Sequence, residues 1–124
     1  NALPHDPNDN FDDASGDGRG FAVSGGVAQA VVNAIHKLDP DREVKVASAQ
    51  GLADCRKMMM MAKAGKYNGY LLEGMACPGG CVAGAGTMVS PEKTAVSVKR
   101  YAAKAEKKHC TETDYLKDLE RLEE

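Results

Sequence analysis

The segment 73–86 restricts the fold of this chain more than any other feature, because it combines two cysteines with a run of glycines. Cys77 and Cys81 follow an apolar run at 70–72 that is typical of a strand buried on both faces of a parallel sheet. Ligands gather at the carboxyl ends of strands in open α/β sheets. Glycine leaves room for a bulky group and lets backbone N–H groups reach sulfur. The spacing fits a pair of iron-sulfur ligands and, equally well, a glycine-rich turn with two incidental thiols.

Other uses of cysteines and glycines fit this segment less well. Structural zinc sites take cysteine pairs in duplicate or with nearby histidines, whereas the three histidines here are scattered. A thioredoxin-type pair has two intervening residues, and a P-loop continues into Gly-Lys-Ser/Thr, which does not follow here. We expect Cys55 to be a core residue on a helix face and Cys110 to be a free thiol.

Charge and composition limit the class of protein. A net charge of -2 gives no basic footprint for nucleic acid, and no apolar stretch is long enough to span a membrane. The first residues are polar and acidic, so we expect no secretion signal. The four cysteines are then expected as reduced thiols or metal ligands, which predicts a cytoplasmic protein.

Apolar periodicity predicts an α/β fold. We expect a small parallel sheet flanked by helices within 20–90, and two additional C-terminal helices within 91–124. Residues 1–19 are rich in Asp, Gly and Pro, which predicts a loop or disorder. One strand is expected at 44–49 and the second from residue 70.

Capping signals predict the helix boundaries. Ser24 is the expected N-cap of a first helix that ends at Asp39. A second helix is expected from Gly51 to Gly65. The residues expected on its inward face are Leu52, Cys55, Met59 and Ala62.

Two further helices are expected near the C-terminus. Pro91 after Ser90 begins the third. Thr111 begins the fourth, with Asp114 as its capping-box partner. A leucine stripe at 116, 119 and 122 is expected to pack on the body of this chain or on a partner.

Two segments resemble signatures of the [FeFe], or iron-only, hydrogenases. The third signature of that family is matched by Glu73, Met75, Cys77, Gly80 and Cys81. The upstream segment 20–27 resembles the family segment in which a phenylalanine, here Phe21, precedes a Gly-Gly-Val helix start. The resemblance covers most of residues 12–124, and the spacing of the two cysteines is its most specific part.

The resemblance implies a set of cofactor-binding residues. In this family the active site is a [4Fe-4S] cubane joined to a diiron unit (the H-cluster), and four cysteines hold it. Cys77 would ligate the cubane, and Cys81 would ligate the cubane and also bridge to the diiron unit. An apolar wall and a close helix entrance at the diiron pocket would come from Phe21, Met75, Gly25 and Gly26.

The implied reaction is the reversible conversion of 2 H+ and 2 e- to H2, with ferredoxin as electron carrier. This chain lacks the first two family signatures, so the missing N-terminal part of the hydrogenase is an expected partner and the isolated chain is expected to be inactive. The family's glycine run usually continues to Gln-Pro, whereas Thr87 follows Gly86 here, which indicates a divergent branch. The alternatives are a hydrogenase-like sensor, an iron-sulfur assembly protein of the nuclear prelamin A recognition factor type, or an interaction module with a Cys77–Cys81 disulfide.

Overall fold

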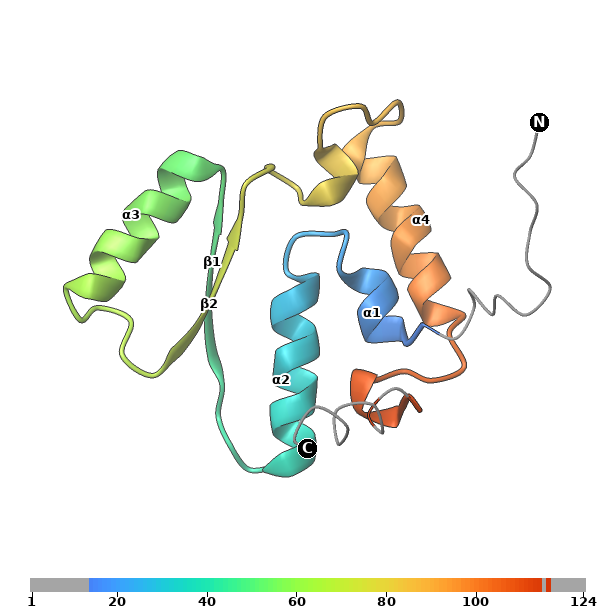
Figure 1. Cartoon of the computed structure of the whole chain (residues 1–124), viewed down its shortest axis with the longest axis horizontal. Coiled ribbons are helices and arrows are strands. Elements are labelled where there is room, and N and C mark those ends of the chain that lie inside the picture. Colours follow the sequence, from blue (N-terminus) through green and yellow to red (C-terminus); the bar gives the residue numbers. More distant parts are fainter. Residues whose placement is uncertain (1–13, 115, 117–124) are drawn as a thin grey trace, which may run out of the picture.

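A computed structural model describes residues 14–114 and residue 116, and its architecture confirms the α/β prediction (Figure 1). In chain order the elements are α1 (Gly16–Gly20), α2 (Gly26–Leu38), β1 (Lys45–Gln50), α3 (Leu52–Lys63), β2 (Tyr70–Met75), the 3-10 turn η1 (Cys81–Ala83), α4 (Pro91–Ala103) and the 3-10 turn η2 (Cys110–Glu112). The two predicted strands and the first three predicted helices all occur within a few residues of their expected bounds.

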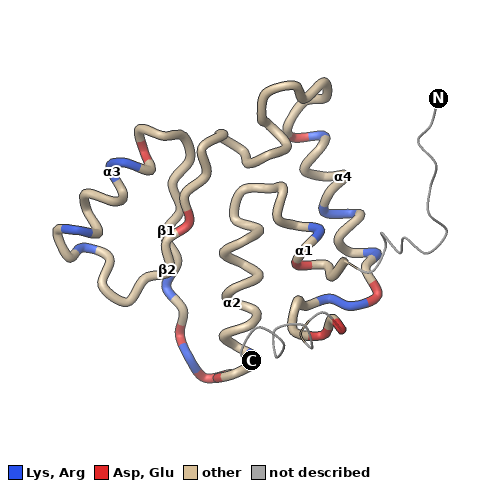
Figure 2. The backbone as a smooth tube through the Cα atoms, in the orientation of Figure 1, with Lys and Arg blue, Asp and Glu red and all other residues tan. Residues whose placement is uncertain are grey.

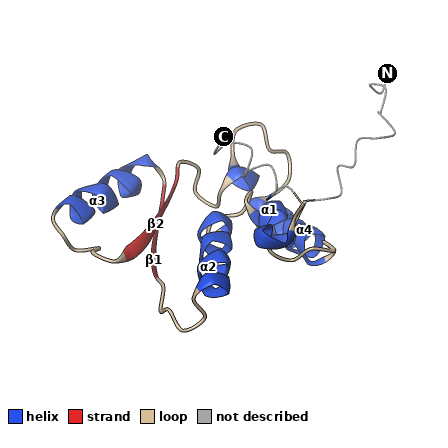
Figure 3. Cartoon of the chain, turned by 60° about the horizontal axis from the view of Figure 1, so that its bottom comes forward, coloured by secondary structure: helices blue, strands red, loops and turns tan. Residues whose placement is uncertain are grey.

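The sheet consists of β1 and β2, which pair in parallel from Lys45 opposite Tyr70 to Gln50 opposite Met75. Helix α3 connects the strands and lies on one side of the sheet, and α2 lies on the other (Figures 1 and 3). Helices α1 and α4 pack together beyond α2. Because the strands are parallel, both deliver their last residues to one edge of the sheet, and the cysteine segment leaves from this edge.

The expectation that the second strand is buried on both faces is wrong. Tyr70 is 39% exposed, and Leu71 and Leu72 are half-buried. The described sheet has two strands, so each strand has an edge without a neighbouring strand in this part of the chain. The residue of β2 that is buried is a carboxylate, Glu73.

The hydrophobic core is small and consists largely of alanine. In α3, Met58 is buried against the sheet, whereas Leu52 and Met59, predicted to face inward, are 75% and 62% exposed. The helix begins directly after Gly51, so residues three apart, such as Cys55 and Met58, face the strands. The buried apolar residues of the described chain are Ala28, Ala30, Ala49, Met58, Val82 and Ala105.

The prediction of a loop or disorder through residue 19 is wrong for its last residues, because Gly16–Gly20 forms a short helix. The side chain of Ser15 accepts a hydrogen bond from the N–H of Gly18 and caps this helix. Asp17 accepts from the amide of Asn33 at 2.7 Å and from the backbone N–H of Cys110 at 3.2 Å. Tertiary hydrogen bonds therefore hold a segment whose composition favours a loop. Residues 1–13 lie outside the described part.

The C-terminal region matches the prediction in part. Helix α4 begins at Pro91 as expected, with Ser90 as N-cap. Thr111 lies within the 3-10 turn η2, which has a capping box between His109 and Glu112, so the expected fourth helix does not begin there. Leu116 is helical, and most of the predicted helix lies outside the described residues. Leu116 is 41% exposed, and the other two leucines of the predicted stripe lie outside the described residues. No helix in the described ranges is both long and apolar enough to cross a membrane.

Candidate functional site

Strand β2 fixes the start of the cysteine segment. Its last residue, Met75, is opposite Gln50, and its carbonyl accepts a hydrogen bond from the N–H of Gly51 at 2.8 Å. The thiol of Cys55 on α3 donates to the same carbonyl and to that of Ala49, both at 3.6 Å. Cys55 thus faces the sheet as expected, but it is half-buried and is not one of the buried core residues. Met75 is therefore held by the sheet and by α3.

The segment after Met75 forms a compact loop that needs glycine. The N–H of Gly80 donates to the carbonyl of Cys77 at 2.9 Å and closes a turn. Gly79 and Gly80 have φ values of +92° and +93°, which side chains strongly disfavour. From β1, Gln50 accepts the N–H of Gly79 through its Oε1 at 2.7 Å. The loop is thus anchored to the end of the neighbouring strand.

The two cysteines differ in exposure. Cys77 is half-buried and Cys81, the first residue of η1, is exposed; both are free thiols. The loop curls so that a Cβ on Gly84 would lie 3.8 Å from the Sγ atom of Cys77. Since glycine stands at position 84, the space beside this sulfur is not filled by a side chain from there.

Backbone contacts join this loop to the segment 20–26. The N–H of Ser24 donates to the carbonyl of Gly79, and the N–H of Val82 donates to the carbonyl of Ala22, both at 3.1 Å. A Cβ on Gly80 would lie 2.7 Å from the carbonyl oxygen of Ala22, so the two backbones are in direct contact. The two segments singled out by sequence resemblance are therefore one structural unit.

Glu73 provides a further connection that the sequence reasoning did not find. Its carboxylate accepts the N–H of Gly25 at 2.8 Å and the N–H of Ala28 at 3.1 Å. The predicted N-cap Ser24 is therefore wrong: Gly25 is the N-cap, and no side chain of the cap residue makes the capping bond. The sequence signal was a charged residue inside an apolar strand, two residues before Met75.

The glycines at the helix entrance have separate structural reasons. Gly25 has a φ of +88°, whereas a Cβ on Gly26 would lie 2.1 Å from the carbonyl oxygen of Gly20. Phe21, between these contacts, is 43% exposed. Phe21 and the two glycines thus lie in the segment that meets the cysteine loop.

Met75 and the two glycines line different cavities. Met75 and Glu73 line a mostly apolar cavity of about 220 Å³ together with Val27 and Val31 of α2. Gly25 and Gly26 line a cavity of about 350 Å³ that extends to α4. Met75 and the two glycines therefore lie on different sides of the α2 entrance.

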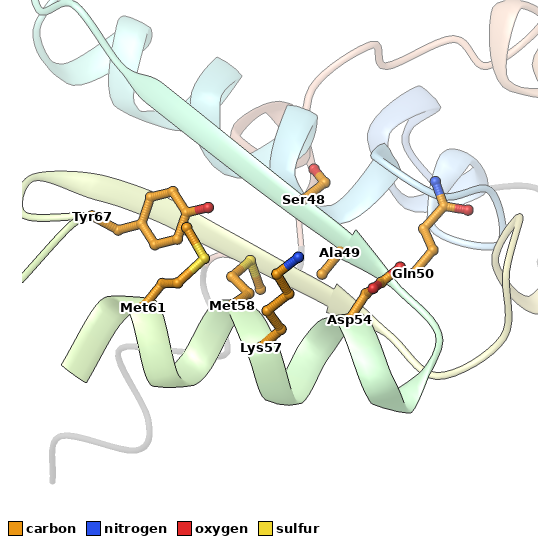
Figure 4. A pocket seen from close by; sticks show the side chains of 8 residues that line it. All are labelled: Ser48, Ala49, Gln50, Asp54, Lys57, Met58, Met61 and Tyr67. Carbon is orange, nitrogen blue, oxygen red and sulfur yellow. The ribbon is translucent and has the colours of Figure 1, made fainter. Parts of the chain in front are cut away.

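A larger cavity of about 450 Å³ lies between the sheet and α3 (Figure 4). Polar and apolar side chains from β1, α3 and the following turn line it: Ser48, Ala49, Gln50, Asp54, Lys57, Met58, Met61 and Tyr67. It is open to solvent, and its link to the cysteine loop is Gln50, which lines the cavity and also accepts the N–H of Gly79.

The unit around the cysteines is almost free of formal charge. No Lys, Arg, Asp or Glu occurs in 74–91 or in 20–36, and Figure 2 shows both segments without charged positions. Glu73 is the charged residue that contacts this unit through both of its oxygens. An apolar, glycine-rich surface of this kind suits a group that carries its own charged and polar ligands.

The donor set fits an iron-sulfur cofactor in part. Such clusters are held by cysteine thiolates, and two free thiols stand on one glycine-rich loop here. Across residues 14–114 and 116, no three His, Cys, Asp or Glu side chains lie close enough together to hold a metal ion. The loop thus offers two thiols, fewer than the four cysteines that such a cluster takes.

Comparison with known proteins identifies the family. A family model described as "Iron only hydrogenase large subunit, C-terminal domain" matches residues 1–85. Over 66 residues the chain is 39% identical to the periplasmic [Fe] hydrogenase large subunit of Nitratidesulfovibrio vulgaris, a match that covers 53% of this chain and 14% of that relative. The family match spans more than half of the chain and includes both segments of the site. This chain belongs to the family formed by the C-terminal domain of the large subunits of iron-only hydrogenases.

Proposed function

We propose that this chain forms part of the cofactor site of an iron-only hydrogenase that catalyses the reversible reduction of 2 H+ by 2 e- to H2. The observation that carries the proposal is the backbone-bonded unit of 20–26 with the Cys77–Cys81 loop. Family membership supports an oxidoreductase role. Ferredoxin, or a carrier like it, is the electron partner that we propose for the complete enzyme.

Each site residue has a proposed role toward the cofactor. Cys77 and Cys81 would hold a [4Fe-4S] cubane through their thiolates, and Cys81 would also join it to the diiron unit. When bound, the cofactor would supply the redox centre at which electrons from the carrier reduce protons. Met75 and Phe21 would exclude water from it with soft, apolar surface. The glycines 25 and 26 let the backbone approach closely.

The remaining ligands are proposed to come from the rest of the hydrogenase. The matched segment covers 14% of the relative, so most of such a protein has no counterpart in the matched part of this chain. Leu52, Met59 and Met60 on α3 are 75%, 62% and 59% exposed. We propose that the rest of the enzyme covers this apolar surface, and that the isolated chain has negligible hydrogenase activity.

The cellular location is also a proposal. Four free thiols, two of them proposed as cluster ligands, favour a reducing compartment, so we propose the cytoplasm. The relative from Nitratidesulfovibrio vulgaris is described as periplasmic, which is a statement about that protein. Fractionation of cells that express the complete protein tests the location.

Iron content and H2 production test the proposed function. The complete protein that contains this sequence should bind iron and sulfide and, once it is also supplied with a synthetic diiron unit, evolve H2 with reduced ferredoxin. Cys77→Ser and Cys81→Ser should each lower the H2 rate by at least about a hundredfold and weaken cluster retention. Cys110→Ser, a half-buried thiol outside the loop, is the matched control and should leave both unchanged.

Two results would contradict the proposal. Full iron retention in the Cys77→Ser and Cys81→Ser double variant would show that the cluster is held elsewhere. Normal cluster loading of the wild-type protein without any H2 production or uptake would favour a sensor or an assembly protein in place of a catalyst.

A further inference from the structure

Glu73 joins two elements that are far apart in the sequence. It lies in β2 and is 8% exposed, so its carboxylate is removed from solvent. Both oxygens reach the first turn of α2, where Oε2 accepts from Gly25 and Oε1 accepts from Ala28. The N–H groups of a helix N-terminus lack partners within the helix and carry partial positive charge. Glu73 therefore replaces the missing side-chain cap of α2 from another element.

The geometry explains why a carboxylate occupies this position. Two N–H donors converge on one side chain, and each is bonded to a different oxygen of it. A glutamine amide has one oxygen, and its NH2 group is itself a donor, so it satisfies one of the two. The partial positive charge at the N-terminus of α2 also stabilises the negative charge of the carboxylate. The carboxylate can therefore stay ionised beside a unit that is otherwise uncharged.

The orientation of β2 links this cap to the cysteine loop. A Cβ on Gly74 would lie 3.3 Å from the sulfur of Cys55, so position 74 faces α3. Side chains alternate along a strand, which turns Glu73 and Met75 toward α2, where both line one cavity. The carboxylate of Glu73 thus sets the distance between the α2 entrance and the strand end from which Cys77 follows.

We propose that Glu73 is a positioning residue. Its carboxylate holds the 21–26 segment at a fixed position relative to Met75 and the Cys77–Cys81 loop. The apolar wall and the thiol pair then face one cofactor as a rigid unit. The inference rests on the proposed function and adds a residue to it. Glu73 touches neither thiol in this account; it acts through Gly25, Ala28 and the strand.

Hydrogen exchange tests the two hydrogen bonds without any cofactor. In the complete apo protein, Glu73→Ala should make the amides of Gly25 and Ala28 exchange at least about tenfold faster. Glu73→Gln should speed exchange at one of these amides and spare the other. The matched control is Ser15→Ala, which removes the side-chain cap of α1 and should affect Gly18 alone. Residue-resolved exchange mass spectrometry gives these rates.

The reduced cluster reports on the positioning role. After iron loading, the paramagnetic resonance spectrum of the reduced [4Fe-4S] cubane should be shifted or broadened in Glu73→Ala. It should be changed less in Glu73→Gln and not at all in Ser15→Ala. A cap that only stabilises a helix would alter stability in both alanine variants and leave both spectra as in wild type.

The outcomes separate this inference from the function beneath it. Unchanged exchange at Gly25 and Ala28 in Glu73→Ala, or faster exchange with an unchanged spectrum, would overturn the positioning role while the proposed function stands. A wild-type protein that loads no cluster, or a cluster that survives removal of both Cys77 and Cys81, would overturn the proposed function and this inference with it.

Discussion

The backbone nitrogen of Ser24 lies 2.6 Å from the position that a Cβ on Gly80 would occupy. The contact is between main chains, because the N–H of Ser24 also donates to the carbonyl of Gly79. Two segments that carry the family resemblance therefore touch at a point where a side chain has no room. The glycine at 80 is a requirement of their contact as well as of its own φ of +93°.

Replacement of Gly80 should be far more damaging than replacement of a glycine that is strained but unobstructed. Gly80→Ala should lower the free energy of unfolding by about 3 kcal/mol or more, since it combines backbone strain with a clash against main-chain atoms. Gly69 has a φ of +78° and nothing within 4 Å of its Cβ position. Gly69→Ala should cost about 1–2 kcal/mol. Urea unfolding of both variants gives the comparison, and equal losses would contradict the contact.

Truncation of two neighbouring methionines of α3 should change the free energy of unfolding by very different amounts. Met58 is 7% exposed against the sheet, and Met59 is 62% exposed. Met58→Ala should lower the free energy of unfolding by about 2–4 kcal/mol through lost burial and a cavity. Met59→Ala should change it by less than about 0.5 kcal/mol. A larger loss for Met59 would show that α3 is rotated about its axis relative to the structure.

Asp17 should contribute strongly to the attachment of α1. Its side chain is 9% exposed, accepts from Asn33 and Cys110, and lies 3.2 Å from Nδ1 of His109. Asp17→Ala leaves half-buried donors without their acceptor and should cost about 1–2 kcal/mol in thermal unfolding. Asp41→Ala, at an exposed turn after α2, is the control and should be nearly neutral. Equal effects would mean that α1 is not held through Asp17.

The turn at η2 should loosen in acid. Backbone hydrogen bonds from His109 and then Lys108 hold the pKa of Glu112 below its ordinary value. A lowered pKa in the folded state means that its contribution to stability is complete above the ordinary carboxyl pKa and is lost as pH falls through the lowered pKa. The protection factors of the His109 and Lys108 amides, which compare each exchange rate with the intrinsic rate at the same pH, should fall across that acidic window. Glu112→Gln should remove this pH dependence, and an unchanged pH profile in that variant would contradict the assignment.

Local patterns predicted the regular elements well. Spacings of three and four predicted α2, Ser90 followed by Pro91 predicted the start of α4, and an apolar run after Gly69 predicted β2. These signals depend on residues close in the sequence, whose effect on the backbone is largely independent of the rest of the fold. The loop and its partner segment were also found, through their resemblance to a family.

Long-range pairing accounts for what local patterns could not predict. The Glu73 carboxylate caps a helix 48 residues away, and Asp17 accepts from a backbone N–H 93 residues away. No local rule connects such positions, so local signals favour Ser24 as the cap and a loop at 16–19. The prediction that Leu52 and Met59 face inward on α3 is wrong, because four methionines in a row at 58–61 give no local signal of which one packs on the sheet.

The location of iron relative to two sulfurs is the most direct test of the account. The complete protein would be reconstituted with iron and sulfide, crystallised, and measured by anomalous diffraction at the iron edge. We predict anomalous density in bonding contact with the Sγ atoms of both Cys77 and Cys81, with Met75 and Phe21 facing the same cofactor. Iron bound elsewhere, with these two thiols free, would contradict it.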